Sequence, residues 1–320
     1  MPRLRKVRPG RDLGYRRVRS GSGFRYVDAD GAALPAAERE RVVALVIPPA
    51  WTDVWICAAA NGHIQATGVD EAGRMQYLYH PDWSTSRDKG KYARALQLAE
   101  RLPHARGRIT ASLRREELDR ERVLATAFRL LDQAAPRVGS ERYYAAHGSR
   151  GLTTLQRRDA VVSGTVISLR FPGKSGRRQL LEVDDADLAA VVDLLAAGRP
   201  AAPLLAYVRG RRRVPLTPKD VNVYVRTMTG GRFTAKDFRT LRGTILAADA
   251  LARIGPARTK TDRKRAEVLA VKAAAAGLGN TPAVAKGSYI DPRVFARYRR
   301  GVLLDTTVSP ESAIRALLAP

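Results

Sequence analysis

The sequence has one cysteine, four histidines and no long apolar segment. A single thiol, Cys57, cannot form an internal disulfide or a zinc site made of thiolates, which agrees with a reducing compartment. All four histidines lie in the first half of the chain, so catalysis by the second half would have to proceed without imidazole. No run approaches the roughly 20 apolar residues of a membrane helix, and the amino terminus lacks the apolar core of a signal peptide. We therefore expect a cytoplasmic protein with no membrane segment.

Acidic residues are also scarce, and the excess of positive charge is large. The 320 residues include 57 Lys and Arg against 31 Asp and Glu, which gives a formal net charge of +26. Ten of these 57 residues are lysines and the other 47 are arginines, whose side chain makes paired hydrogen bonds with phosphate. Basic residues cluster at 3–25, 209–213 and 258–265. An arginine-rich genome would raise the arginine content by itself, but so much unpaired charge favours nucleic acid as the partner.

The residue pattern predicts two domains of different class. Before residue 80, three β-type segments are separated by Asn61-Gly62 and by residues 70–73, which predicts a small antiparallel sheet. From Lys91 onward, apolar residues recur at three- and four-residue spacing, which is typical of helices. We therefore expect an α+β fold, with a β domain at residues 1–88 and a larger, mainly helical domain at 89–320.

One β-hairpin is expected to interrupt these helices. VVSGTVISLRF and RRQLLEV are typical of two strands, and FPGKSG between them predicts a tight turn with Lys174 at its tip. Further along, Gly279 is placed to end a helix, and Thr281 and Asp291 each precede a proline, as N-cap residues do. Tyr289 lies in the short stretch between those two helix starts.

Two acidic clusters would suit a Mg²⁺ site, because nucleases and polymerases hold this ion on paired carboxylates. Asp28 and Asp30 lie at a predicted turn, whereas Asp184, Asp185 and Asp187 precede a predicted helix. Both positions also suit carboxylates that accept hydrogen bonds from backbone amides. The second explanation is favoured, and we expect neither a metal nor another cofactor.

Four segments resemble a known family by their order and composition: PRVGSERYYAAHGSRGLTTL, FPGKSG, DFRTLRGT and LGNTPAVAKGSYIDP. Together with GVDEAGRMQYLYH near the amino terminus, they resemble the type IB DNA topoisomerases, most of all the compact bacterial and poxvirus-like branch. The resemblance covers almost the whole chain. It implies a monomer that closes as a two-domain clamp around double-stranded DNA and is associated with the nucleoid. The implied activity is relaxation of positive and negative supercoils, by metal- and ATP-independent cleavage and religation of one strand through a 3′-phosphotyrosyl intermediate.

The resemblance assigns catalytic roles to five residues. Tyr289 matches the family's nucleophile and Lys174 its general acid. Arg137, Arg239 and Asn280 match residues that stabilise the phosphate in the transition state. Asn280 departs from the eukaryotic and poxvirus members, which carry histidine there, and an amide can donate a hydrogen bond but cannot transfer a proton.

The resemblance also places Gln76, Tyr77 and Tyr79 against DNA. Alternation along a strand would send Gln76 to one face and the two tyrosines to the other. Glutamine is a natural partner for an adenine edge in the major groove. The alternative is that both tyrosines belong to the hydrophobic core.

Two other functions stay open at this point. A tyrosine site-specific recombinase uses the same phosphotyrosyl chemistry, but recombinases usually carry histidine three residues before the second arginine, where this chain has Lys236. Their amino-terminal domains are also helical rather than β. A non-catalytic DNA-packaging protein would need only the positive charge.

Overall fold

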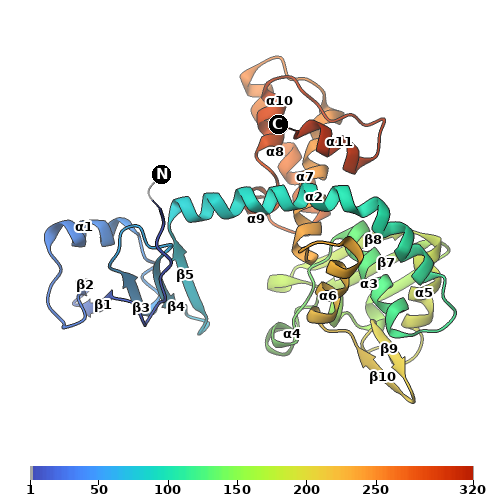
Figure 1. The fold of residues 1–320 in the computed structure, drawn as a ribbon, viewed down its shortest axis with the longest axis horizontal. Coiled ribbons are helices and arrows are strands. Elements are labelled where there is room, and N and C mark those ends of the chain that lie inside the picture. The colour runs from blue at the N-terminus through green and yellow to red at the C-terminus, as the bar shows by residue number, and fades with distance from the viewer. Residues whose placement is uncertain (1–2, 320) are drawn as a thin grey trace. The chain divides into compact units, whose positions relative to one another are not determined.

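The computed structural model describes residues 3–319, apart from the side chains of residues 84–89 and 175. The chain divides into two compact units, Met1–Gly90 and Lys91–Pro320. The first, which we call the amino-terminal unit, is built on a β-sheet, and the second, the carboxy-terminal unit, is mainly helical (Figure 1). The expected α+β class is therefore confirmed.

The amino-terminal unit consists of one sheet and one short helix. Its elements are β1 (Gly14–Ser20), β2 (Gly23–Val27), α1 (Ala36–Ala44), β3 (Thr52–Cys57), β4 (Ile64–Val69) and β5 (Met75–Tyr79). The strands are antiparallel in the order β2-β1-β3-β4-β5, so β5 forms an edge of the sheet (Figure 1). Val42 of α1 packs with Val54, Ile56 and Ala66 of the sheet, and these buried side chains form most of the unit's core.

Helix α2 (Pro81–Leu113) contains the boundary between the two units. It begins ten residues before Lys91, the residue from which the helical pattern was expected. The remaining helices of the carboxy-terminal unit are α3 (Arg120–Ala134), α4 (Glu141–His147), α5 (Ala186–Ala196), α6 (Pro218–Thr229), α7 (Ala235–Ile254), α8 (Lys260–Gly277), α9 (Pro282–Ser288), α10 (Arg293–Arg299) and α11 (Pro310–Leu317). Three 3-10 turns complete the helical elements: η1 (Leu152–Thr154), η2 (Arg157–Asp159) and η3 (Lys174–Gly176).

The carboxy-terminal unit also contains two small antiparallel sheets. One joins β6 (Ala160–Ser163), β7 (Val166–Pro172) and β8 (Arg178–Asp184) in sequence order, and the other joins β9 (Ala206–Arg209) to β10 (Arg212–Pro215). The segment 161–171 was expected to be a single strand, and that prediction was wrong. Gly164 has φ 59° and turns the chain between β6 and β7, which then pair with each other.

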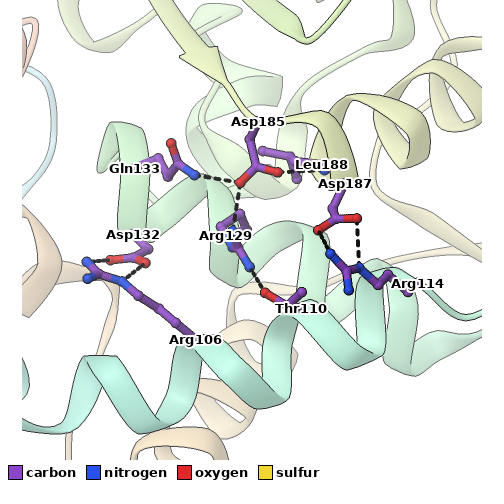
Figure 2. Close-up of polar contacts among 9 residues, drawn as sticks. All are labelled: Arg106, Thr110, Arg114, Arg129, Asp132, Gln133, Asp185, Asp187 and Leu188. Carbon is purple, nitrogen blue, oxygen red and sulfur yellow. Dashed lines mark hydrogen bonds and ion pairs between the residues drawn. The ribbon is translucent and has the colours of Figure 1, made fainter.

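Arginine–carboxylate pairs join α2, α3 and the start of α5 (Figure 2). The guanidinium of Arg106 on α2 donates to both carboxylate oxygens of Asp132 on α3, at 2.7 and 2.9 Å. Arg129 on α3 donates to Asp185 at 2.7 Å, and the other oxygen of Asp185 accepts from the backbone N–H of Leu188 at 2.9 Å. Asp185 is therefore the N-cap of α5, as expected from the sequence.

Asp28, in the other acidic cluster, also accepts hydrogen bonds from backbone N–H groups. One carboxylate oxygen of Asp28 accepts hydrogen bonds from the N–H groups of Asp30 and Ala32, at 3.0 and 2.9 Å, which closes the turn after β2. Asp187 is paired with Arg114 at 3.0 Å (Figure 2). Asp28, Asp185 and Asp187 thus each have a structural partner.

The core of the carboxy-terminal unit surrounds α3 and α7. Phe128 of α3 packs edge-on against Phe238 of α7, and the buried face of α8 adds Ala270 and Ala274.

No single helix in residues 3–319 is long and apolar enough to cross a membrane; α8 and α9 meet that criterion together, but they are bent by 95° at their junction.

Candidate active site

Helix α7 carries Arg239 into the interior of the carboxy-terminal unit. The helix starts at a capping box, in which the carboxylate of Asp237 accepts from the backbone N–H and the hydroxyl of Thr234 at 2.9 Å each. Arg239 is only 4% exposed, and its two Nη atoms donate to the carbonyl oxygens of Ala135 and Leu278 at 2.6 and 3.0 Å. These two carbonyls belong to the C-caps of α3 and α8, where a cation is favoured by the helix dipoles.

Tyr289 is the C-cap of the short helix α9, and its backbone N–H donates to the carbonyl of Ala285 at 2.9 Å. The helix starts where the sequence predicts, because the hydroxyl of Thr281 accepts from the N–H of Val284. The Tyr289 ring is 7% exposed, and the Cζ atom of Arg239 lies 4.9 Å from its centroid. The nucleophile expected from the sequence is thus buried against the second arginine.

The charges around Tyr289 favour its ionised form. Burial is the largest single effect and by itself would raise the pKa of the phenol. It is outweighed by the combined effect of the charge and hydrogen bonding of Arg239 and of the charges of Arg137 and Lys236. The pKa of Tyr289 is therefore held below its ordinary value. The pKa of Arg239 is also lowered. Burial and the positive charge of Arg137 lower it, whereas the interaction with Tyr289 opposes them by raising it.

Arg137 and Asn280 are in direct contact. Arg137 lies in the loop after α3, and its Nη2 donates to Oδ1 of Asn280 at 2.5 Å. The loop packs closely on Gly151, because a Cβ atom at that position would lie 2.6 Å from the carbonyl oxygen of Arg137. The same oxygen accepts from the N–H of Leu152 at 2.8 Å. Glycine at 151 is thus required for the position of Arg137.

Two buried donors in this cluster make no hydrogen bond to any residue that the structure describes. They are Nε of Arg239 and Nδ2 of Asn280, which is 8% exposed. Buried N–H groups are rarely left unpaired, because the loss of hydration costs about 1–3 kcal/mol for each. Donors of this kind beside two guanidinium groups are suited to hold an anion with several oxygen atoms.

Lys174 lies where the sequence predicts, on the turn η3 between β7 and β8, and its side chain is exposed. The structure brings Arg137, Arg239, Asn280 and Tyr289 together. Among the contacts of the described residues, none joins Lys174 to these four.

The exposed face of β5 carries the two tyrosines expected to contact DNA. Tyr77 and Tyr79 are 47% and 38% exposed, and their rings stack with centroids 6.0 Å apart. Leu78 points the other way and packs against the core, so the alternative that the tyrosines are core residues was wrong. Gln76 is half-buried and donates from Nε2 to the carboxylate of Asp70 at 2.7 Å.

Thr244 is a residue of this site that the sequence analysis missed. It lies five residues after Arg239 on α7, and its Oγ1 is 3.2 Å from the carbonyl oxygen of Tyr289. The same atom accepts from the N–H of Asp291 at 3.1 Å. Thr244 thus holds the backbone at Asp291, while its one hydroxyl proton is within reach of two carbonyls, that of Thr240 at 2.8 Å and that of Tyr289. A helical wheel of α7 would have indicated it, because residues 239, 240, 243 and 244 share one face.

Replacing Thr244 with valine is expected to lower the free energy of unfolding by about 1–3 kcal/mol, because the buried N–H of Asp291 loses its acceptor. The measurement is urea unfolding followed by circular dichroism. Thr227 on α6 offers the control, since its exposed hydroxyl bonds only to the carbonyl of Val223 among the described contacts. Thr227→Val should change stability by about 0.5 kcal/mol or less, and equal effects of the two substitutions would contradict the role of Thr244.

Family models and a known protein match most of this chain. Residues 80–300 match the family model described as eukaryotic DNA topoisomerase I, catalytic core. Residues 23–70 match the model described as bacterial DNA topoisomerase IB, N-terminal domain. A DNA topoisomerase 1B of Acanthamoeba polyphaga mimivirus is 30% identical over 285 residues, which cover 87% of this chain and 85% of the viral protein.

Proposed function

Because the chain belongs to the type IB DNA topoisomerases, we propose that it relaxes supercoils of both signs by cutting and rejoining one DNA strand through Tyr289. The observation that carries this proposal is a pair of buried donors, from Arg239 and Asn280, that have no partner within the described part of the chain and lie beside a tyrosine of lowered pKa. These groups suit a phosphodiester, whose two non-bridging oxygens need several donors during displacement at phosphorus. Family membership also favours this enzyme over the recombinase and the packaging protein.

The cleavage step exchanges one phosphate ester for another. The phenol of Tyr289 gives its proton to water, and its oxygen attacks phosphorus. The bond from this oxygen to phosphorus forms as the bond from phosphorus to the 5′ oxygen breaks, and the 5′ oxygen takes a proton from Lys174. One end of the cut strand is now joined to Tyr289 through a 3′-phosphotyrosyl bond, and the other end carries a free 5′-hydroxyl. The DNA on the side of the free end can rotate about the intact strand. Religation reverses the step.

Three residues have the task of stabilising charge on the phosphate. The guanidinium groups of Arg137 and Arg239 supply fixed positive charge, and Nε of Arg239 is available to one non-bridging oxygen. Arg137 donates to Oδ1 of Asn280, which leaves Nδ2 of Asn280 as the donor to the second non-bridging oxygen. Because Arg239 and Asn280 are buried and the half-buried Arg137 is held by its hydrogen bond to Asn280, little reorganisation is needed as charge develops.

Lys174 has the role of general acid for the 5′ oxygen. It lies on an exposed turn, so its ammonium group is accessible to DNA bound on the surface of the carboxy-terminal unit. No metal or ATP enters this mechanism, because arginines neutralise the phosphate and the ester bond energy is conserved in the phosphotyrosyl bond.

The amino-terminal unit has the role of a second DNA-binding half. Tyr77 and Tyr79 present a stacked aromatic surface on the edge strand β5, and Gln76 can exchange its bond with Asp70 for a base edge in the major groove. Together the two units would act as a clamp on double-stranded DNA. All five catalytic residues come from one chain, so a monomer associated with the nucleoid suffices.

Plasmid relaxation tests the proposed function. The purified protein is expected to relax positively and negatively supercoiled plasmid in EDTA and without ATP, as followed on agarose gels. A strict requirement for Mg²⁺ or ATP, or relaxation of one sign alone, would reject the mechanism. A further arm with Tyr298→Phe serves as a control, because Tyr298 is a buried tyrosine that bonds to the carbonyl of Gly255 outside the site.

A further inference from the structure

The turn that carries Lys174 is anchored at its base to the Arg137 region. The carbonyl oxygen of Pro172, two residues before Lys174, accepts from the backbone N–H of Arg150 at 2.7 Å. Arg150 directly precedes Gly151, on which the Arg137 loop packs. Within the turn, the N–H of Gly173 donates to the carbonyl of Arg177 at 2.8 Å. One side of the hairpin base is thus fixed by backbone hydrogen bonds.

The side chain of Gln179 fixes the other side of the same base. Gln179 pairs with Phe171 across β7 and β8, one step before the turn. A Cβ atom on Gly173 would lie 2.7 Å from Cγ of Gln179, and a Cβ atom on Gly279 would overlap its Oε1. Nε2 of Gln179 also lies 3.4 Å from the carbonyl oxygen of Gly279. Gln179 therefore fills the space between two glycines, one next to Lys174 and the other next to Asn280.

We propose that Gln179 is the positioning residue that sets the Lys174 turn against the Asn280 segment, so that the lysine reaches the leaving oxygen. This inference rests on the proposed function. Gln179 touches no reacting atom itself. It acts by packing, because at 3.4 Å its contact with the carbonyl of Gly279 is longer than the usual range of about 2.7–3.2 Å for such hydrogen bonds. The two glycines are needed because any larger side chain would displace it.

This role predicts a specific pattern of defects. When the strand is cut, the 5′ oxygen takes a proton from Nζ of Lys174 as its bond to phosphorus breaks. A 5′ sulfur leaves as a thiolate, whose conjugate acid has a pKa near 8.5, and it needs no proton. A displaced Lys174 therefore slows cleavage at oxygen and spares cleavage at sulfur. Misplacement by about 1 Å can cost up to about 100-fold in rate.

The test is single-turnover cleavage of two matched duplexes, one with a 5′-oxygen and one with a 5′-sulfur at the scissile phosphate. Gln179→Ala is expected to cleave the oxygen substrate about 10- to 100-fold more slowly than the native chain and the sulfur substrate at the native rate. Gln179→Met, which keeps the length of the side chain, should recover most of the rate. Leu180→Ala, an exposed neighbour on β8, is the matched control and should cleave both substrates normally.

The outcomes separate this inference from the proposed function. Absence of covalent cleavage by the native chain would reject the function itself. If the native chain cleaves DNA and Gln179→Ala cleaves it at the same rate, the positioning role is wrong. It is also wrong if both Gln179 variants cleave the oxygen and sulfur substrates more slowly by the same factor. The double variant Lys174→Ala/Gln179→Ala should cleave the oxygen substrate no more slowly than Lys174→Ala alone, and multiplied defects would also overturn the proposal.

Discussion

Replacing Tyr289 with phenylalanine is expected to abolish both plasmid relaxation and the covalent attachment of DNA to the protein. The substitution removes only the oxygen that attacks phosphorus, and the ring keeps its place beneath Arg239. DNA binding and the fold should therefore be preserved. The measurement is denaturing electrophoresis of the protein after incubation with labelled DNA, with a gel-shift assay to confirm that binding persists.

Tyr298→Phe is the matched control for this experiment. Tyr298 is a buried tyrosine of the carboxy-terminal unit, and the substitution removes one hydrogen bond, to Gly255. It should cost about 1 kcal/mol of stability and leave the adduct intact. An adduct that persists in Tyr289→Phe would place the nucleophile on another residue.

Replacing Lys174 with alanine is expected to slow cleavage of a normal strand by about 10²- to 10⁴-fold, the usual contribution of a general acid. The direction of the effect follows from the leaving group, whose difference in pKa sets an upper bound on what the acid can contribute. The phenol of tyrosine ionises near pKa ~10, whereas a sugar hydroxyl resembles water at about 15.7. The 5′ alkoxide is therefore a poorer leaving group by about six pKa units, or roughly 8 kcal/mol.

The same variant should cleave a 5′-sulfur strand at close to the native rate, because the thiolate leaves without a proton. Lys272→Ala provides a control, since Lys272 is an exposed lysine on α8. Lys272→Ala should cleave both the oxygen and the sulfur substrate at the native rate. Equal losses on oxygen and sulfur in Lys174→Ala would show that the lysine does not act as the acid.

The local elements were largely predictable, and the errors have local causes. The turns at Asn61-Gly62 and residues 70–73 separate β3, β4 and β5 as expected, because turn residues act on their own neighbours. The break at Gly164 was missed, because a glycine inside a β-branched run is compatible with a continuous strand as well as with a turn. Asp291 was expected as an N-cap, but Pro292 takes that position, and the carboxylate of Asp291 instead accepts from the backbone N–H of Arg293.

The sequence by itself determined the family, the identities of the candidate catalytic residues and the alternation along β5. These depend on residue types in a linear order, which the chain carries before it folds. Only the tertiary structure decided that Tyr77 and Tyr79 face outward, because alternation defines two faces and packing selects which one is buried. It also decided that Nδ2 of Asn280 has no hydrogen-bond partner among the described residues and that the pKa of Tyr289 is lowered. Burial and charge are sums over residues far apart in sequence, and they exist only once the chain has folded.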